Sequence, residues 1–200
     1  MNNKLKKIVI YTDGACIGNP GPGGYGVVLI YGDRRKELSG GFRLTTNNRM
    51  EIMAAIVGLS ALRTRCSVVL YTDSQYLSDA MNKGWAKRWR AKGWRRNKKN
   101  KALNPDLWQQ LLDLCERHDV DFVWVRGHAG NVENERCDRL STEAAEKKHL
   151  PADSAYETTC LNAGCSDTGP KTSDSYRQSL LCYELPGFAC GGVTDSDESG

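Results

Sequence analysis

Five short segments of the chain have the pattern of β-strands. Most of them are rich in Val, Ile, Leu or Tyr and end next to Gly or Asp, as strands of a folded sheet commonly do. They are residues 7–12, 25–31, 37–44, 67–72 and 121–125. A Gly- and Pro-rich loop at residues 18–24 separates the first strand from the second, and a turn around Gly32 and Asp33 joins the second to the third, so the pattern predicts an antiparallel meander at the start of the chain.

Helical patterns account for most of the remaining body of the chain. Residues 48–62 are apolar on nearly every side, which predicts a helix packed inside the protein rather than on its surface. Shorter helical pieces follow residue 74, and residues 105–117 and 132–148 form two further predicted helices. A meander followed by alternating strands and helices indicates an α/β fold whose five-stranded mixed sheet, antiparallel first and then parallel, is flanked by helices.

Regular periodicity ends near His149, where Pro151 follows and Ser, Thr, Gly and Asp become frequent. A length of 200 residues suits one domain with an appendage. We therefore expect a folded domain over residues 1–149 and a flexible, acidic, Cys-containing extension over residues 150–200.

The formal net charge of +4 is the sum of two opposed parts. Residues 1–150 carry 26 basic and 16 acidic side chains, which leaves +10, whereas residues 151–200 carry two basic and eight acidic side chains, which leaves −6. A basic body favours a polyanionic partner such as nucleic acid. The acidic extension suggests the hypothesis that it folds back on the body and competes with that partner.

Cysteine usage and hydropathy bear on the compartment. Four cysteines lie in the body, which has enough apolar residues for a core of its own, so we expect reduced thiols at Cys16, Cys66, Cys115 and Cys137. For the four cysteines of the extension, Cys160, Cys165, Cys182 and Cys190, a zinc site or disulfides remain alternatives to an unliganded segment. No run of 18 or more apolar residues exists, and the polar N-terminus leads straight into a strand pattern, so we expect a cytoplasmic protein without a membrane partner.

Acidic residues follow two of the predicted strands. If the strands that precede Asp13 and Asp73 are parallel neighbours, about 4.8 Å apart, both carboxylates reach one edge of the sheet, where ligand sites of α/β proteins gather. Each acid also has an ordinary alternative. Asp13 and Asp73 could cap turns or helices. Glu51 could form a capping box with Asn48, and Asp138 could be a solvated helix residue.

Taken together, these acids favour a metal site. Carboxylates that converge from different elements repel one another and raise their pKa values unless cations neutralise them. Carboxylate oxygens that share a site with a phosphate suit Mg²⁺ or Mn²⁺. Two such ions about 4 Å apart can activate a water and stabilise the leaving oxygen in phosphodiester displacement.

Residues 83–101 form a basic segment with ten Lys or Arg, no acid and three of the five tryptophans. A run of charge is usually a solvated face or a disordered segment, but interleaved Trp rings argue against both alternatives. Trp85 and Trp89 are four residues apart and therefore share one face of a helix. Basic side chains can neutralise phosphates while the rings pack on sugar or base, so the segment predicts a nucleic-acid contact.

Four sequence motifs stand out, in the order YTDG at residues 11–14, TTNNRMEI at 45–52, YTDSQY at 71–76, and GHAG followed by NERCD, which ends at Asp138. In order and spacing, residues 5–148 resemble the ribonucleases H of the bacterial type 1 family. The resemblance implies a five-stranded sheet flanked by helices and a catalytic domain over residues 1–149. It also implies endonucleolytic cleavage of the RNA strand of RNA/DNA hybrids, with Mg²⁺ or Mn²⁺ as cofactor and 3′-hydroxyl and 5′-phosphate ends as products.

The resemblance assigns catalytic roles residue by residue. The metal-binding carboxylates match Asp13, Glu51, Asp73 and Asp138, with Asp13 bridging two ions. His128, in a loop flanked by glycines, matches a histidine that assists proton transfer or product release.

Contacts with the hybrid are also implied. Minor-groove contacts that read 2′-hydroxyls match Cys16, Asn19, Asn47, Asn48 and Gln75, although short amides in turns also act as local caps. The basic segment matches the protrusion that holds the DNA strand, with Trp85 and Trp89 as its aromatic contacts. Thr46 and Asn104 match a pocket for a DNA phosphate, whose basic member falls on Leu44, with Arg43 one place earlier. By contrast, we expect core packing for Met50, Met53, Trp108 and Trp124.

Three classes of function are therefore compared. A hybrid-specific, metal-dependent ribonuclease, working as a monomer, accounts for both the acids and the basic segment. A non-catalytic module that binds hybrid or double-stranded RNA would not need four matched acids. Another nuclease or a transposase of the same fold would need neither the RGHAG loop nor the basic segment. The sequence favours the first class.

Overall fold

A computed structural model describes residues 5–162 of the chain. The alternatives of a zinc site or disulfides involve Cys165, Cys182 and Cys190, which lie outside the described residues, as does most of the acidic extension. Within residues 5–162, no helix combines the length and the apolar character that crossing a bilayer requires.

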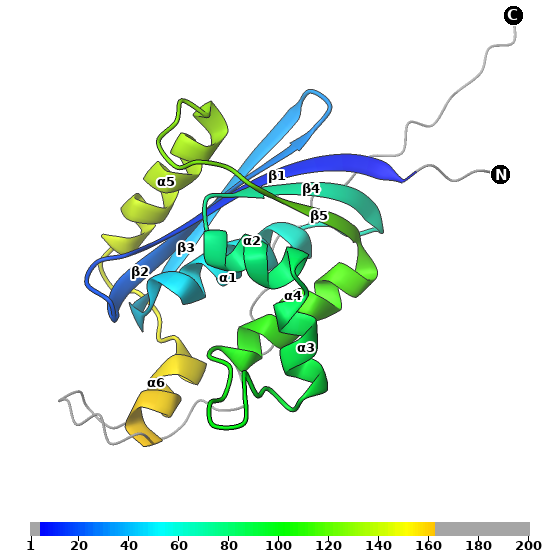
Figure 1. The fold of residues 1–200 in the computed structure, drawn as a ribbon. Coiled ribbons are helices and arrows are strands. Elements are labelled where there is room, and N and C mark those ends of the chain that lie inside the picture. The colour runs from blue at the N-terminus through cyan, green and yellow to red at the C-terminus, as the bar shows by residue number, and fades with distance from the viewer. Residues whose placement is uncertain (1–4, 163–200) are drawn as a thin grey trace, which may run out of the picture.

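The sheet has five strands in the order β3-β2-β1-β4-β5 (Figure 1). The strands are β1 (Lys6–Cys16), β2 (Gly21–Tyr31), β3 (Arg34–Thr45), β4 (Cys66–Thr72) and β5 (Asp119–Trp124). The first three pair antiparallel as a meander, whereas β4 pairs parallel with both β1 and β5. The predicted α/β fold with a mixed five-stranded sheet is confirmed.

The loop between β1 and β2 is shorter than the Gly- and Pro-rich sequence at residues 18–24 predicts. β1 continues to Cys16 and β2 begins at Gly21, so most of the predicted loop at residues 18–24 is strand. The reason is tertiary packing. A Cβ built on Gly24 would lie 2.2 Å from the carbonyl oxygen of Ser141, and one built on Gly26 would lie 2.2 Å from that of Cys137, so these glycines let a helix backbone pack directly on β2.

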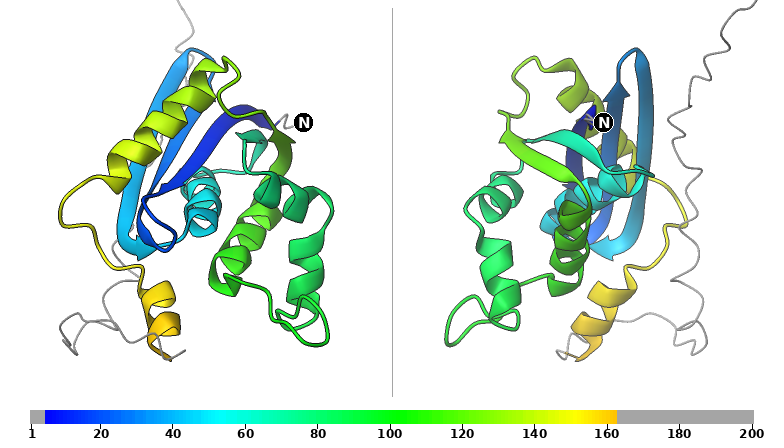
Figure 2. Two further views of the ribbon diagram at one scale, coloured as in Figure 1. Left: turned by 60° about the vertical axis from the view of Figure 1, so that its left-hand side comes forward. Right: turned by 90° about the vertical axis from the view of Figure 1, so that its right-hand side faces the viewer.

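Two layers of helices enclose the sheet (Figure 1 and Figure 2). The helices are α1 (Asn47–Ser60), α2 (Gln75–Asn82), α3 (Trp85–Ala91), α4 (Pro105–Arg117), α5 (Val132–Ala145) and α6 (Ser154–Asn162). α1 packs on β1 and β2 and contacts α4, and the main core lies on this side. α5 packs on β1, β2 and β3 from the opposite face, over a small cluster that includes Val28, Cys137 and Leu140.

Helix α1 is buried along most of its length, as its continuous apolar sequence predicts. Met50, Ile52 and Leu59 have no exposed surface. Because the helix is enclosed by the sheet and by α4, its position relative to β1 is fixed by packing on several sides. Its first turns carry Asn47, Asn48 and Glu51 to the edge of the sheet.

The chain beyond His149 packs on the body as far as the structure describes it. The backbone N–H of Arg43 donates to the carbonyl of Pro151, and buried Asp153 pairs with buried Arg49 of α1 at 2.6 Å. Arg49 also pairs with Asp106 of α4 at 2.8 Å. Residues 150–162 therefore differ from the flexible segment expected there, because contacts between residues more than 100 positions apart leave no local sequence pattern. The boundary at residue 149 itself stays a prediction.

Candidate active site

Strand register places two carboxylates side by side. In the parallel pair β1 and β4, Thr12 lies opposite Thr72, and the next residues are Asp13 and Asp73. β1 continues beyond this point as a partner of β2 alone, so Asp13 lies where the pairing with β4 stops rather than at the end of its strand. The expected juxtaposition of the two acids is thus produced by backbone pairing.

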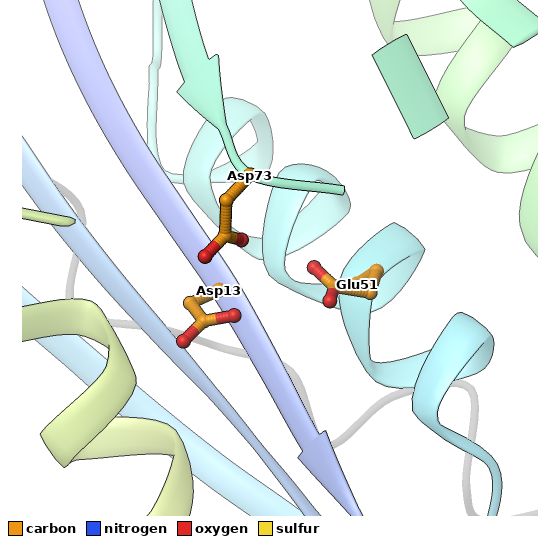
Figure 3. A group of neighbouring side chains, drawn as sticks. All are labelled: Asp13, Glu51 and Asp73. Carbon is orange, nitrogen blue, oxygen red and sulfur yellow. The ribbon is translucent and has the colours of Figure 1, made fainter. Parts of the chain in front are cut away.

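Glu51 completes a cluster of three acids. It lies in the second turn of α1 with a side chain that is 5% exposed. Carboxylate oxygens of Asp13, Glu51 and Asp73 all lie within 4.8 Å of one another. Figure 3 shows the three side chains pointing toward one another from β1, from α1 and from the end of β4.

The helix ends exclude the ordinary alternatives for Asp73 and Glu51. Ser74, not Asp73, caps α2, and its hydroxyl accepts from the backbone N–H of Leu77 at 3.3 Å. The N-cap of α1 is Thr46, without a side-chain cap bond, so Asn48 lies inside the helix and forms no capping box with Glu51. Asp73 and Glu51 therefore reach the cluster without a helix-capping role, whereas Asp13 Oδ1 accepts from the backbone N–H of Gly14 at 2.7 Å.

Burial makes these carboxylates hard to ionise. Removal from water, reinforced by the negative charges of Asp73 and Asp138, raises the pKa of Asp13 to about 8. Burial, together with Asp13 and Asp73, also holds the pKa of Glu51 well above its usual range. A bound cation would reverse both effects, because it stabilises the charged forms.

The donor set suits a hard divalent cation. Glu51 Oε2 is buried and has no hydrogen-bond partner among the described residues, while Glu51 Oε1 accepts from Asn47 Nδ2 at 3.4 Å. Three clustered carboxylates with an unpaired buried oxygen match the oxygen ligands that Mg²⁺ and Mn²⁺ prefer. Asp13, Glu51 and Asp73 could hold such an ion.

Asp138 and His128 lie at the border of this cluster. Asp138 is on α5, and its charge contributes to the raised pKa of Asp13, but its oxygens are not part of the group within 4.8 Å. His128 lies in the loop between β5 and α5, is exposed, and has a φ of +51° in the left-handed region. The loop thus presents the imidazole to solvent.

Two side chains that the sequence did not point to contact Asp73. The indole of Trp124 donates to the carbonyl oxygen of Asp73 at 3.0 Å, and Asn134 Nδ2 donates to Asp73 Oδ2 at 3.2 Å. The expectation that Trp124 is a core residue is wrong, because it is on the edge strand β5 and 49% exposed. The position of Asn134 four residues before Asp138, on one helix face, is the signal that could have identified it.

Two of the five predicted minor-groove residues are connected to the acidic cluster by hydrogen bonds. Asn19 Oδ1 accepts from the backbone N–H of Asn47 at 3.3 Å, and Asn47 in turn contacts Glu51. Cys16 Sγ lies 3.6 Å from the carbonyl oxygens of Gly21 and Thr45. The remaining two, Asn48 and Gln75, are exposed at the starts of α1 and α2.

The basic segment forms a groove next to α1. Its lining includes Trp85, Arg88, Lys92, Arg95 and Asn48. The two tryptophans of α3 differ, because Trp85 is half-buried at the groove whereas Trp89 is only 8% exposed. The ring of Trp89 packs against Trp85 and Trp108, and the ring of Trp108 is fully buried.

The predicted phosphate pocket is partly occupied by contacts within the protein. Asn104 Oδ1 accepts from Arg49 Nη1 at 3.3 Å, and Thr46 is the half-buried N-cap of α1. Arg43, the basic residue nearest in sequence, pairs with Glu157 of α6 at 2.8 Å. Its charge is therefore partly neutralised by the chain that follows residue 150.

Carboxylates that converge from β1, from α1 and from the end of β4, next to a basic groove lined by tryptophan, define a metal-dependent hydrolase of nucleic acids. The family model described as RNase H matches residues 5–146, and the chain belongs to the ribonuclease H family. It is a hydrolytic endonuclease that cleaves RNA in RNA/DNA hybrids. This function decides against the non-catalytic binding module.

Individual relatives agree with the family match. Ribonuclease H of Syntrophus aciditrophicus (strain SB) is 72% identical over 151 residues, which cover 76% of this chain and 87% of the relative. Ribonuclease H of Rippkaea orientalis is 68% identical over 157 residues, 78% of this chain and 96% of the relative. Among solved structures, LC9-RNase H1, a type 1 RNase H with the type 2 active-site motif, is 32% identical with a TM-score of 0.65, covering 80% of this chain and 83% of that one.

Proposed function

We propose that this ribonuclease H hydrolyses the RNA strand with two divalent cations, Mg²⁺ in the first place and Mn²⁺ as a substitute. The proposed ligands are Asp13, Glu51, Asp73 and Asp138, with Asp13 between the two ions. The observation that carries the proposal is the approach of three carboxylates to within 4.8 Å, those of Asp13 and Glu51 buried and that of Asp73 half-buried, which is unfavourable without a cation.

The protein's own residues hold and orient the reactants. When bound, the two cations would supply an activated water and stabilise the oxygen that leaves phosphorus. Displacement breaks the bond from phosphorus to the 3′-oxygen, so the products carry a 3′-hydroxyl and a 5′-phosphate. A bound cation would favour the ionised carboxylates of Asp13 and Glu51, whose pKa values are raised by burial without one. His128, exposed on the loop before α5, is suited to carry a proton to or from the leaving group.

We propose that the hybrid lies across the acidic cluster and the groove of the basic segment. In this arrangement the groove lined by Trp85 and Arg88 holds the DNA strand, while Asn19 and Asn47 read the minor groove beside the scissile phosphate. The hydrogen bond from Asn47 to Glu51 supports this assignment, because it joins a residue that reads the ribose to a proposed metal ligand. The remaining proposed contacts are Cys16, Thr46, Asn48, Gln75, Trp89 and Asn104.

Compartment and assembly are also proposals. Cys16, Cys115 and Cys137 form no disulfide within residues 5–162, which supports a reducing compartment such as the cytoplasm. All members of the acidic cluster come from one chain, which supports action as a monomer.

The decisive experiment compares three substrates under three metal conditions. RNA/DNA hybrid, duplex RNA and duplex DNA are incubated with Mg²⁺, with Mn²⁺ or with EDTA, and the ends of the products are mapped by their sensitivity to phosphatase. We expect cleavage of RNA in the hybrid only, 5′-phosphate ends, and no product in EDTA or with Asp13→Asn. Activity that persists in EDTA would reject the two-metal mechanism.

A further inference from the structure

Asn134 is a buried polar side chain at the start of α5. Only 2% of the residue is exposed, although it lies in the first turn of the helix. The backbone N–H of Asn134 donates to Oδ1 of the N-cap Asn131 at 3.2 Å, which fixes the backbone but does not involve the amide of the Asn134 side chain. That amide is therefore available for another role.

The amide of Asn134 holds one side of Asp73. Its Nδ2 donates to Asp73 Oδ2 at 3.2 Å, and the same oxygen lies close to Gly127, where a Cβ would approach it to 2.8 Å. The backbone of Asp73 is held separately, since Trp124 donates to its carbonyl oxygen at 3.0 Å. Asp73 is thus restrained through its backbone by β5 and through its carboxylate by α5.

Stability alone does not account for this side chain. Asn134 Oδ1 is buried and has no hydrogen-bond partner among the described residues. A buried amide oxygen without a partner is unfavourable, and unfavourable polar groups are most often retained where function requires them. Three features of Asn134 therefore point to the same site: burial, the contact with Asp73 and the unpaired oxygen.

Asn134 also links two of the proposed metal ligands. Residues four apart lie on one face of a helix, so Asn134 and Asp138 face the cluster from the same element. A hydrogen bond from this helix to Asp73 sets the separation of Asp73, at the end of β4, from Asp138, on α5. The amide thus joins the end of β4 to the helix that carries Asp138.

We propose that Asn134 is a positioning residue that orients the Asp73 carboxylate for metal binding and ties it to α5. The inference rests on the proposed metal dependence. Partners that orient metal ligands typically contribute about 10–100-fold to metal affinity or activity. Loss of the amide removes none of the four acidic residues, but the carboxylate of Asp73 is then free to rotate.

The test compares Asn134→Ala with Asn131→Ala. Mn²⁺ binding is measured by calorimetric titration, and kcat is measured against Mg²⁺ concentration with hybrid as substrate. For Asn134→Ala we expect metal affinity and kcat to fall about 10–100-fold, with KM for the hybrid changed less than about twofold. Asn131→Ala removes the helix cap but no contact with Asp73, so thermal stability should fall while metal affinity stays within about twofold.

Two further variants keep the test decisive. Asn134→Ser replaces Asn134→Ala in the test if the alanine variant folds poorly. Its side chain is too short to reach Asp73, so we expect the same loss of metal affinity. In the Asp73→Asn background, Asn134→Ala should have little further effect on Mn²⁺ binding, because the two residues act through one contact. Wild-type metal affinity in Asn134→Ala, or additive effects in the double variant, would reject the positioning role. If the wild type itself binds no Mn²⁺ and cleaves hybrid in EDTA, the proposed metal mechanism fails instead.

Discussion

At the scale of single residues, the acidic cluster lowers the stability of the metal-free protein but favours the binding of cations. Asp13 and Glu51 are removed from water beside Asp73, so their ionised forms are unfavourable in the folded protein without a cation. The same arrangement concentrates negative charge where divalent cations bind strongly. The metal-free protein is therefore destabilised at the site that carries the reaction.

This conflict predicts that Asp13→Asn stabilises the metal-free protein while abolishing cleavage. The pKa of Asp13 is about 8 in the folded protein against an ordinary value near 3.8, so between these values the folded state binds a proton that the unfolded chain has released. Stability contributed by this group is present below about pH 4 and is lost as the pH rises toward about 8. In EDTA at pH 8 we expect the variant to be more stable by about 1–3 kcal/mol in urea unfolding.

The pH series and the metal are the controls for this prediction. The difference between Asp13→Asn and the wild type should shrink as the pH falls toward 4, and Mg²⁺ at pH 8 should also reduce it by stabilising the wild type. Asp33→Asn, which changes an exposed acid in the turn between β2 and β3, should show neither effect. A difference that is independent of pH would contradict the assigned cause.

The three acids of the cluster could be predicted from the sequence, whereas the side chains that donate hydrogen bonds to Asp73 could not. Asp13 and Asp73 follow recognisable strand patterns, and Glu51 lies in a motif of the family, so all three could be predicted. The hydrogen bonds of Asn134 and Trp124 to Asp73 could not, since they depend on how α5 and β5 pack around the end of β4. Burial of Trp124 was wrongly expected for a related reason: β5 is an edge strand, and a strand pattern alone does not give its place in the sheet.

At the scale of elements, α3 gives its two tryptophans different environments. Trp85 lines the basic groove, and Lys83 Nζ lies 5.3 Å from the centre of its ring. Trp89, one turn later, packs edge to face on Trp108 with 5.9 Å between ring centres. Both residues line the groove and their ring centres lie 6.4 Å apart, as the predicted shared helix face requires. They differ in burial, because Trp89 is 8% exposed and belongs to the core whereas Trp85 is half-buried.

This difference predicts separate consequences for two matched substitutions. Trp85→Ala should weaken binding of hybrid about 5–150-fold, because ring stacking contributes about 1–3 kcal/mol, and should change thermal stability little. Trp89→Ala should lower the free energy of unfolding by about 3 kcal/mol or more, because it opens a cavity against Trp108. Both are measured with a catalytically inactive Asp13→Asn background, by hybrid titration and by urea unfolding. The reverse pattern would assign Trp85 to the core.

At the scale of the whole molecule, α6 and the residues before it connect the acidic extension to the catalytic body. Arg49 and Asp153 are 3% and 4% exposed, and Asp106 completes a network among α1, α4 and the segment before α6. The described part of the chain, residues 5–162, is thus one packed unit. Of the net charge of −6 in residues 151–200, −4 lies beyond residue 162, where six acidic and two basic side chains follow.

The buried ion pair predicts that Asp153→Asn is strongly destabilising. Removing one member of a buried pair leaves the other charge without its partner, and the typical cost is about 3–5 kcal/mol, here reduced by the second contact of Arg49 with Asp106. Glu157→Gln is the matched control, because its partner Arg43 is exposed and such surface pairs contribute less than about 1 kcal/mol. Equal losses of thermal stability for the two variants would show that the buried pair is not an anchor.

The anchor also changes how the hypothesis about the acidic extension is tested. A chain that ends at His149 lacks Asp153, so a change in its hybrid affinity could come from lower stability or from the loss of negative charge. A chain that ends at Asn162 retains the ion pair and removes only the part with a net charge of −4. Competition with nucleic acid predicts tighter hybrid binding at low salt for this chain, and an unchanged affinity would reject it.

Gly26 has a consequence for anyone who would transplant this site onto another scaffold. It lets the backbone of α5 at Cys137 lie against β2, and the two residues of α5 that face the acids, Asn134 and Asp138, are within one turn of that contact. How far Asn134 and Asp138 extend toward the acids therefore depends on the absence of a Cβ atom at Gly26. A graft that copies the acids but places any larger residue on the strand would move the helix outward and assemble the ligands at the wrong spacing.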